Sequence, residues 1–205
     1  MRIAGISIVA LLCLWGVGCA PSISTVSVNP SFRPAGPMRM AVLDFDWQPP
    51  SGQVAEGATM VSAPNAGKFV ADSVSSRLLT VSGFEMIERS RLNQLLREKD
   101  LSQTDLIDQG QYKEIGQFLG VDYLVLGTVS TYTTWANGPL SGHLVSFSCR
   151  CIHVETGKVV WMLSGATEKG PTGPLDPAIS VRDILNDAIP KLIQQLAQAA
   201  APKTN

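Results

Sequence analysis

Hydrophobic and polar residues are most regularly patterned between residues 83 and 130, and the rest of the chain can be placed around this stretch. Residues 84–87 form a short apolar run after a glycine, which predicts a strand. Ser90 then stands where a helix N-cap is expected, and leucines recur at i, i+3 and i+4 over residues 92–96. This spacing predicts a helix with one buried face.

A second helix and a central strand follow. Large apolar residues recur at helical spacing over residues 112–119, and Gly120 is placed to adopt the left-handed conformation that ends many helices. Residues 123–129 are almost all apolar or β-branched, without the alternation of a sheet that has one wet face. We therefore expect helices to cover both faces of this strand or its ends.

The region before this stretch predicts a strand, a loop and a helix. Residues 38–47 alternate as a strand does, residues 48–63 carry Pro, Gly and Ser without periodicity, and residues 65–81 repeat at helical spacing. Two strands joined by this helix predict a β-α-β unit. Asp44 and Asp46 could be a metal or acid/base pair, but acidic residues before a turn more commonly cap backbone N–H groups.

The region after the central strand predicts antiparallel strands and a closing helix. Residues 137–139 form an Asn-Gly-Pro turn, residues 143–154 return as a partner strand, and a Thr-Gly turn leads into residues 158–164. Asp176, followed by a proline, is a good N-cap for an apolar helix that Pro190 should kink or split. The predicted fold class is α/β: a single domain with a mixed sheet of about five strands flanked by helices.

Several pieces of the chain, in one order, resemble the curli-secretion channel subunit (CsgG) family. They are Met-Ala-Val-Leu-Asp-Phe at residues 40–45, IERSRLNQLLREK at 87–99, IGQFLGVDYLVLGTVS at 115–130, and a strand, Thr-Gly turn and partner strand at 149–160. The resemblance implies the periplasmic α/β domain of that family. It also implies either a subunit of a curli-type secretion complex or an activator like the lipoproteins that stimulate peptidoglycan synthases, because one fold hosts several functions.

The N-terminus has the shape of a secretory signal. Arg2 precedes an apolar segment at residues 6–17, which is shorter than the ~20 residues of a spanning helix. Val-Gly before Cys19 resembles the lipobox of bacterial lipoproteins, although Gly16 stands where that motif prefers Leu. The resemblance implies removal of residues 1–18 and lipidation of Cys19 with acyl chains such as palmitate; the alternative is an ordinary signal peptide with an incidental cysteine.

These features divide the chain into an anchor, a tether and a domain. Ala20 follows the cysteine where an Asp would retain the protein at the inner membrane, so the resemblance implies the periplasmic face of the outer membrane. We expect a lipidated tether at residues 19–37, which are rich in Ser and Pro, a CsgG-like domain at 38–199 and a frayed tail at 200–205.

Four possible metal ligands have odd numbers along one predicted strand: His143, Cys149, Cys151 and His153. Ligands at i and i+2 of a strand lie about 6.6–6.8 Å apart, whereas zinc sites usually take pairs from tight turns. The residues between them on that face are apolar, so we predict a buried core without a metal. The same spacing disfavours a disulfide between the two cysteines.

Composition and motifs exclude several classes of function. The net charge is −1 and basic residues are dispersed, so the chain lacks the electrostatic footprint of a nucleic-acid-binding protein. It contains no phosphate loop or nucleophile elbow. We expect no enzyme, no catalytic residues and no cofactor or small-molecule substrate, with an envelope hydrolase the least favoured alternative. The expected partners are the membrane, through the lipid anchor, and other envelope proteins, including further copies of the chain.

The hairpins of a membrane pore are also not expected. A curli-type pore takes two hairpins from each subunit, with strands of ~9–11 residues that alternate apolar and polar side chains. Residues 131–144 leave about half of that length per arm. Prolines and glycines between residues 164 and 179 should prevent a second hairpin.

Overall fold

The computed structural model describes residues 22–34, 36–48, 59–88, 109–170 and 176–201. The elements, in chain order, are β1 (Ile23–Val28), β2 (Met38–Val42), β3 (Asp46–Trp47), β4 (Thr59–Ser62), α1 (Ala66–Leu78), β5 (Phe84–Met86), α3 (Gln109–Leu119), β6 (Tyr123–Asn137), β7 (Leu140–His153), β8 (Val159–Lys169) and α4 (Pro177–Ala200). The signal segment, Cys19 and the helix expected at residues 92–96 lie outside the described residues.

The strands form one mixed sheet. Its order is β1-β8-β7-β6-β2-β5, with β3 and β4 also paired to β6. β2 runs parallel to β5 and β6, so the predicted β-α-β unit is confirmed, while the β6–β7 and β7–β8 pairs are antiparallel. The fold class is therefore as predicted, but the sheet has eight strands instead of about five.

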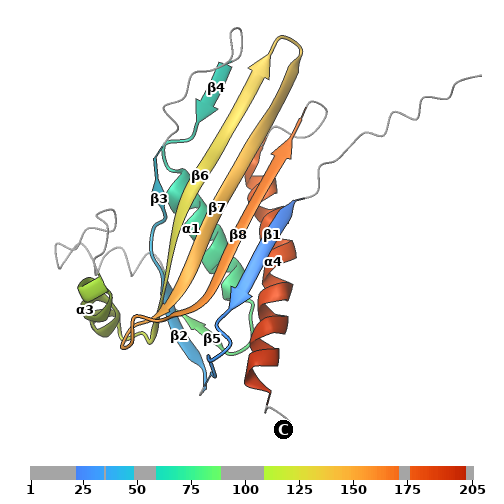
Figure 1. The fold of residues 1–205 in the computed structure, drawn as a ribbon. Helices are drawn as coiled ribbons and strands as arrows, with labels where there is room; N and C mark the ends of the chain where they lie inside the picture. The colour runs from blue at the N-terminus through green and yellow to red at the C-terminus, as the bar shows by residue number, and fades with distance from the viewer. Residues whose placement is uncertain (1–21, 35, 49–58, 89–108, 171–175, 202–205) are drawn as a thin grey trace, which may run out of the picture.

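Helices cover most of one face of the sheet, short of the end of the β6–β7 hairpin, and the other face at one end (Figure 1). α1 and α4 pack on the first face over a large apolar core that contains the fully buried residues Met40, Leu78, Trp161, Ile184 and Leu185. α3 packs on the opposite face at the end of the sheet where β6 begins, and buries a smaller core. The start of β6 is thus covered on both sides, which explains its continuous apolar sequence.

Local signals place several elements where the sequence predicts them. Gly120 ends α3 with φ +66°, the left-handed conformation expected of it. Asp176 caps α4, because its carboxylate accepts a hydrogen bond from the N–H of Ala178 at 2.9 Å. Pro190 lies inside α4, which continues through it, so the proline does not split the helix. Packing of both halves of α4 on the sheet offsets the one backbone hydrogen bond that a proline removes.

The N-terminal boundary of the domain differs from expectation. The expected tether at residues 19–37 is wrong for residues 23–28, which form β1 and pair antiparallel with β8, from Ile23 opposite Ala166 to Val28 opposite Trp161. Only Val26 of this edge strand is buried. A strand with so little apolar surface looks like a linker in sequence, because its stability comes from its neighbours.

Three further elements differ from their expected bounds: one strand lies inside an expected loop, and a strand and a helix end later than expected. β4 lies within the loop expected at residues 48–63 and pairs with the end of β6. β8 continues to Lys169, beyond the expected end at residue 164, so the glycine at 165 does not stop the strand. α4 continues to Ala200, because its alanines favour helix.

Candidate functional site

The structure places all four of the possible metal ligands on β7 but does not bring them together. His143 is buried at one end of the strand, where its Nε2 lies 2.6 Å from Ser180 Oγ of α4. His153 lies at the other end, with its ring edge-on to Tyr123 at a centroid distance of 5.2 Å. No group of three or more His, Cys, Asp or Glu side chains converges within the part of the chain that the structure describes, and this includes Asp44 and Asp46.

Cys149 and Cys151 are buried free thiols in the large core. Burial raises the pKa of Cys149 to about 12 and the pKa of Cys151 well above its usual value. Both groups therefore stay protonated at physiological pH, which makes these thiols poor nucleophiles. They act as small apolar residues of the core, as their place on the strand predicts.

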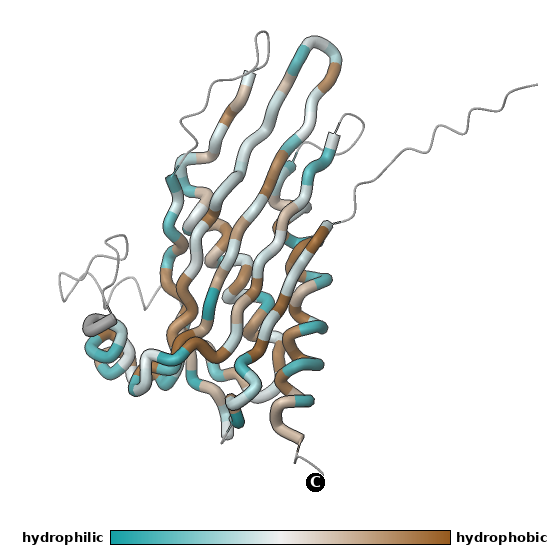
Figure 2. The backbone as a smooth tube through the Cα atoms, viewed as in Figure 1, coloured by the Kyte–Doolittle hydropathy of each residue, from teal (hydrophilic) through white to brown (hydrophobic). Residues whose placement is uncertain are grey.

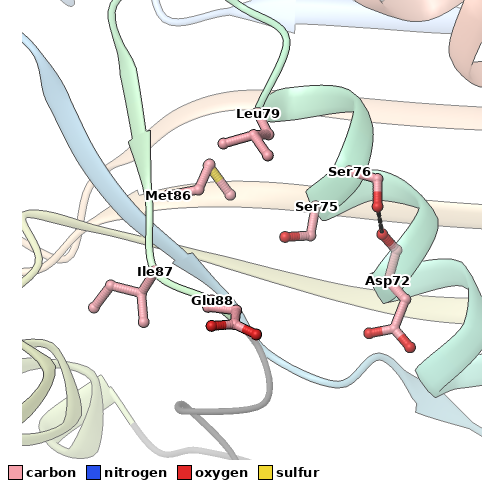
Figure 3. A pocket seen from close by; sticks show the side chains of 7 residues that line it. All are labelled: Asp72, Ser75, Ser76, Leu79, Met86, Ile87 and Glu88. Carbon is pink, nitrogen blue, oxygen red and sulfur yellow. Dashed lines mark hydrogen bonds between the residues drawn. The ribbon is translucent and has the colours of Figure 1, made fainter.

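A groove of about 420 Å³ lies between the C-terminal half of α1 and the end of β5 (Figure 3). Its apolar floor is made of side chains from both elements, and polar groups line its rim. The lining residues are Asp72, Ser75, Ser76, Leu79, Met86, Ile87 and Glu88. Leu79, just past the end of α1, is 64% exposed.

The chemistry of this groove favours binding over catalysis. Ser76 Oγ donates to the backbone carbonyl of Asp72 at 2.9 Å, and the Asp72 carboxylate pairs with Lys68 at 3.2 Å. The groove thus offers hydroxyls and carboxylates but no histidine, so the serines have no adjacent base of the usual kind. A groove with an exposed leucine beside Met86 at one end and two carboxylates at the other suits contact with a protein side chain (Figure 3).

Sequence reasoning misses this groove, because its residues come from a helix end and a strand end that are separate in the chain. The one local signal is Leu79, which follows Leu78 at the C-terminus of α1. Two adjacent leucines at a helix end cannot both face the core, since successive residues are about 100° apart on a helix.

Comparison with known proteins identifies the family. Residues 22–149 match the family of the curli production assembly/transport component CsgG. The chain belongs to the CsgG family. The match begins at β1 and ends in β7, so β1 belongs to the family's domain. No curated protein matches the sequence.

Three solved structures are similar to the chain at low sequence identity. Lipoprotein GNA1162 from Neisseria meningitidis is 17% identical, with a TM-score of 0.57 over 79% of this chain and 99% of that one. The PelC dodecamer from Paraburkholderia phytofirmans is 12% identical, with a TM-score of 0.46 over 89% and 99%. The LpoB C-terminal domain from Escherichia coli is 14% identical, with a TM-score of 0.43 over 65% and 84%. The likeness to GNA1162 shows that this CsgG-family member has the fold of a known lipoprotein.

No membrane-spanning helix is found in the described part of the chain. None of its helices combines the length and the apolar character needed to cross a bilayer. α4 is the longest, and it carries polar and charged residues along its exposed face.

Proposed function

We propose that this CsgG-family protein is a lipoprotein, anchored through Cys19 at the periplasmic face of the outer membrane, whose domain binds or scaffolds other proteins of the cell envelope. The observation that carries this proposal is the Val-Gly-Cys sequence at the end of the apolar N-terminal segment, combined with the family match that begins three residues later. Several acyl chains on one cysteine give stable attachment, because each buried CH₂ contributes ~0.8 kcal/mol.

The arrangement of the domain supports binding through surfaces. The large core is fully packed, its two thiols stay protonated, and its one buried histidine faces a serine of α4. The groove at the end of α1 is open and presents an exposed leucine at one end and carboxylates at the other (Figure 3). Such features fit contact with a protein partner, and we expect no catalytic activity.

A subunit of a curli-type secretion or transport complex is the second candidate function. It is favoured by the description of the family as an assembly/transport component of curli production. The two candidates differ in partner: a secretion subunit would assemble with further copies of itself, whereas a scaffold or an activator of a peptidoglycan synthase would bind a different protein.

Two experiments test the proposal. Labelling of cells with a radioactive or clickable palmitate analogue should mark the wild-type protein, and Cys19→Ser should remove both the label and the outer-membrane location. In vivo crosslinking followed by affinity purification should then recover envelope proteins with the lipidated form. A Cys19→Ser protein that still fractionates with the outer membrane after an alkaline wash would overturn the lipid anchor. Recovery of the lipidated form without any crosslinked protein would overturn the scaffold.

A further inference from the structure

One end of the sheet extends well beyond its neighbours. The β6–β7 hairpin rises past the end of β8 and past the start of β1 (Figure 1). β8 ends at Lys169, which lies opposite His143, so among the described residues no strand pairs with the hairpin from Thr134 to Gly142 on the β7 side. On the β6 side, within the described part of the chain, it pairs with β4, whose first residue, Thr59, lies opposite Ala136. We call this part of the sheet, residues 59–61 and 134–142, the tip.

The tip exposes large apolar side chains on both faces. Met60 lies opposite Trp135, and Trp135 lies opposite Gly142, so these residues share one face with Leu140. The Trp135 ring lies directly over Gly142, because a Cβ there would be 2.7 Å from it. Met60 is 46% exposed and Leu140 is 50% exposed. Val61, which is 61% exposed, points to the other face.

Figure 2 shows hydrophobic residues, in brown, at the tip in both β4 and β7. A protein that docked on a flat sheet would need an apolar surface on one face only. Exposed apolar residues on both faces suit immersion of the whole tip in an apolar or interfacial medium.

The tip is also free of ionic groups. The sequence contains no Asp, Glu, Lys or Arg between Asp122 and Arg150, and none in β4. Charged residues reappear at the end of β8 with Glu168 and Lys169, just below the tip. Lys169 pairs with Asp183 of α4 at 3.2 Å, which marks the level at which the domain surface becomes polar. Side chains that reach the hydrocarbon edge of a bilayer are favoured when they are uncharged, because moving a charge out of water is costly.

The start of β1 lies at the same end of the sheet as the tip. Ile23 pairs with Ala166, and Ala166 pairs with Ser146. Leu140 precedes Ser146 by six residues, so the tip reaches ~20 Å beyond the level of Ile23 at ~3.3 Å per residue. Cys19 precedes Ile23 by four residues, which span at most ~14 Å. Along the strand direction, the tip thus reaches at least as far as the anchored cysteine.

We propose that the tip is a second membrane contact, which inserts into the headgroup region of the bilayer that holds Cys19. This inference rests on the proposed lipid anchor, because the anchor determines which end of the domain faces the membrane. It adds the surface of the domain that contacts the lipid. Trp135 suits the interface, where an indole sits at headgroup level. The tip is too short to span a bilayer, since a spanning strand needs ~9–11 residues, and its depth matches the ~5–10 Å of an interfacial element.

Quenching of tryptophan fluorescence by brominated lipid tests this contact. The mature lipidated protein would be placed in vesicles of phosphatidylethanolamine and phosphatidylglycerol with bromines near the headgroup end of the acyl chains. We expect quenching that Trp135→Phe abolishes, because Trp161 is buried in the core and Trp47 lies on β3 below the tip. Vesicle flotation in the same samples reports the anchor independently.

A matched pair of variants separates the tip from general surface hydrophobicity. Leu140→Asp adds a charge at the tip and should lower the quenching of Trp135. Met162→Asp adds the same charge at an equally exposed residue, also 50% exposed, in the middle of β8, and should leave the quenching unchanged. Equal effects of the two substitutions would overturn the proposal.

A second preparation distinguishes failure of the tip contact from failure of the proposed lipid anchor. Protein with Cys19→Ser and an N-terminal His-tag would be held on vesicles that contain nickel-chelating lipid. Trp135-dependent quenching in this form supports the tip contact even if palmitate labelling shows that Cys19 carries no lipid. Flotation without Trp135-dependent quenching in both forms overturns the tip contact and leaves the anchor standing. Crosslinking of tip residues between two copies at every lipid content would also overturn it, because a second copy would then cover the tip.

Discussion

The side chain of Gln195 in α4 hydrogen-bonds to the backbone of Val26 and Val28 in β1, in the way that the backbone of a neighbouring strand would. Its side-chain oxygen accepts the Val28 N–H at 3.1 Å, and its side-chain nitrogen donates to the carbonyl of Val26 at 3.0 Å. These two backbone groups point to the free edge of β1, so one glutamine closes part of an edge that would otherwise invite pairing with another chain. The first strand of the domain is thereby held by its last helix.

Replacement of Gln195 should weaken the domain and expose this edge. Gln195→Leu leaves two backbone groups without their partner, and we expect a loss of ~1–3 kcal/mol in the free energy of unfolding. Urea unfolding followed by circular dichroism measures it. Gln194→Leu, at an exposed position on the same helix, is the control and should change stability by less than ~0.5 kcal/mol. Similar losses for the two variants would contradict the role of Gln195.

A second link between β1 and α4 should make the free energy of unfolding depend on pH. The Asp187 carboxylate accepts hydrogen bonds from Lys191 Nζ and Ser24 Oγ, both at 2.6 Å, and these bonds hold the pKa of Asp187 below its usual range. A lowered pKa in the folded state adds stability above the unfolded pKa of ~3.9, and this stability is lost as the pH falls through the folded value.

We therefore expect Asp187→Asn to lower the free energy of unfolding at pH 7 by only ~0.5 kcal/mol, because the pair is partly exposed and screened. The difference from wild type should shrink as the pH falls below ~3.9. Urea unfolding of both proteins from pH 7 to pH 2.5 measures it. A difference that stays constant over this range would mean that the carboxylate charge contributes nothing to the link.

The buried thiols give a third prediction. In the Cys19→Ser protein without its signal segment, Cys149 and Cys151 are the remaining cysteines. Burial keeps both protonated, so neither should react with a thiol reagent at pH 8 in the folded state, and both should react in guanidinium. Absorbance of the released thiolate counts them. Rapid reaction of either thiol in the folded protein would show that this core opens.

Strong local signals explain which parts of the fold can be predicted from sequence. α1 has helical periodicity, α4 begins at an Asp-Pro pair, and the turn before β6 contains Gly120 in the required conformation. Each of these signals lies within one element. The family resemblance adds their order and the mixed sheet.

Non-local pairing explains the parts that cannot be predicted. β1 and β4 are short, have few buried residues and are stabilised by strands far away in the sequence. The absence of charge between Asp122 and Arg150 is visible in the sequence, but its meaning depends on register. Only the pairing of Ile23 with Ala166 places the start of β1 at the same end of the sheet as the tip.

The close approach of α3 to β7 gives the last prediction. A Cβ at Gly116 would lie 2.3 Å from a side-chain carbon of Val154, which follows β7, so the helix can pack on this end of the sheet only because residue 116 has no side chain. Gly116→Ala raises helix propensity by up to ~1 kcal/mol. Overpacking costs ~1–3 kcal/mol, so we expect a net loss of stability.

A double-mutant cycle separates these two effects. Val154→Ala alone should destabilise the protein by removing buried methyl groups, but the combination with Gly116→Ala should be more stable than Val154→Ala itself. In that background the new methyl group enters space that the valine has vacated, and the gain in helix propensity is no longer offset. Urea unfolding of the four proteins gives the coupling energy. Additive effects would show that α3 shifts away from β7 without cost, and the smaller core would then not fix the position of this helix.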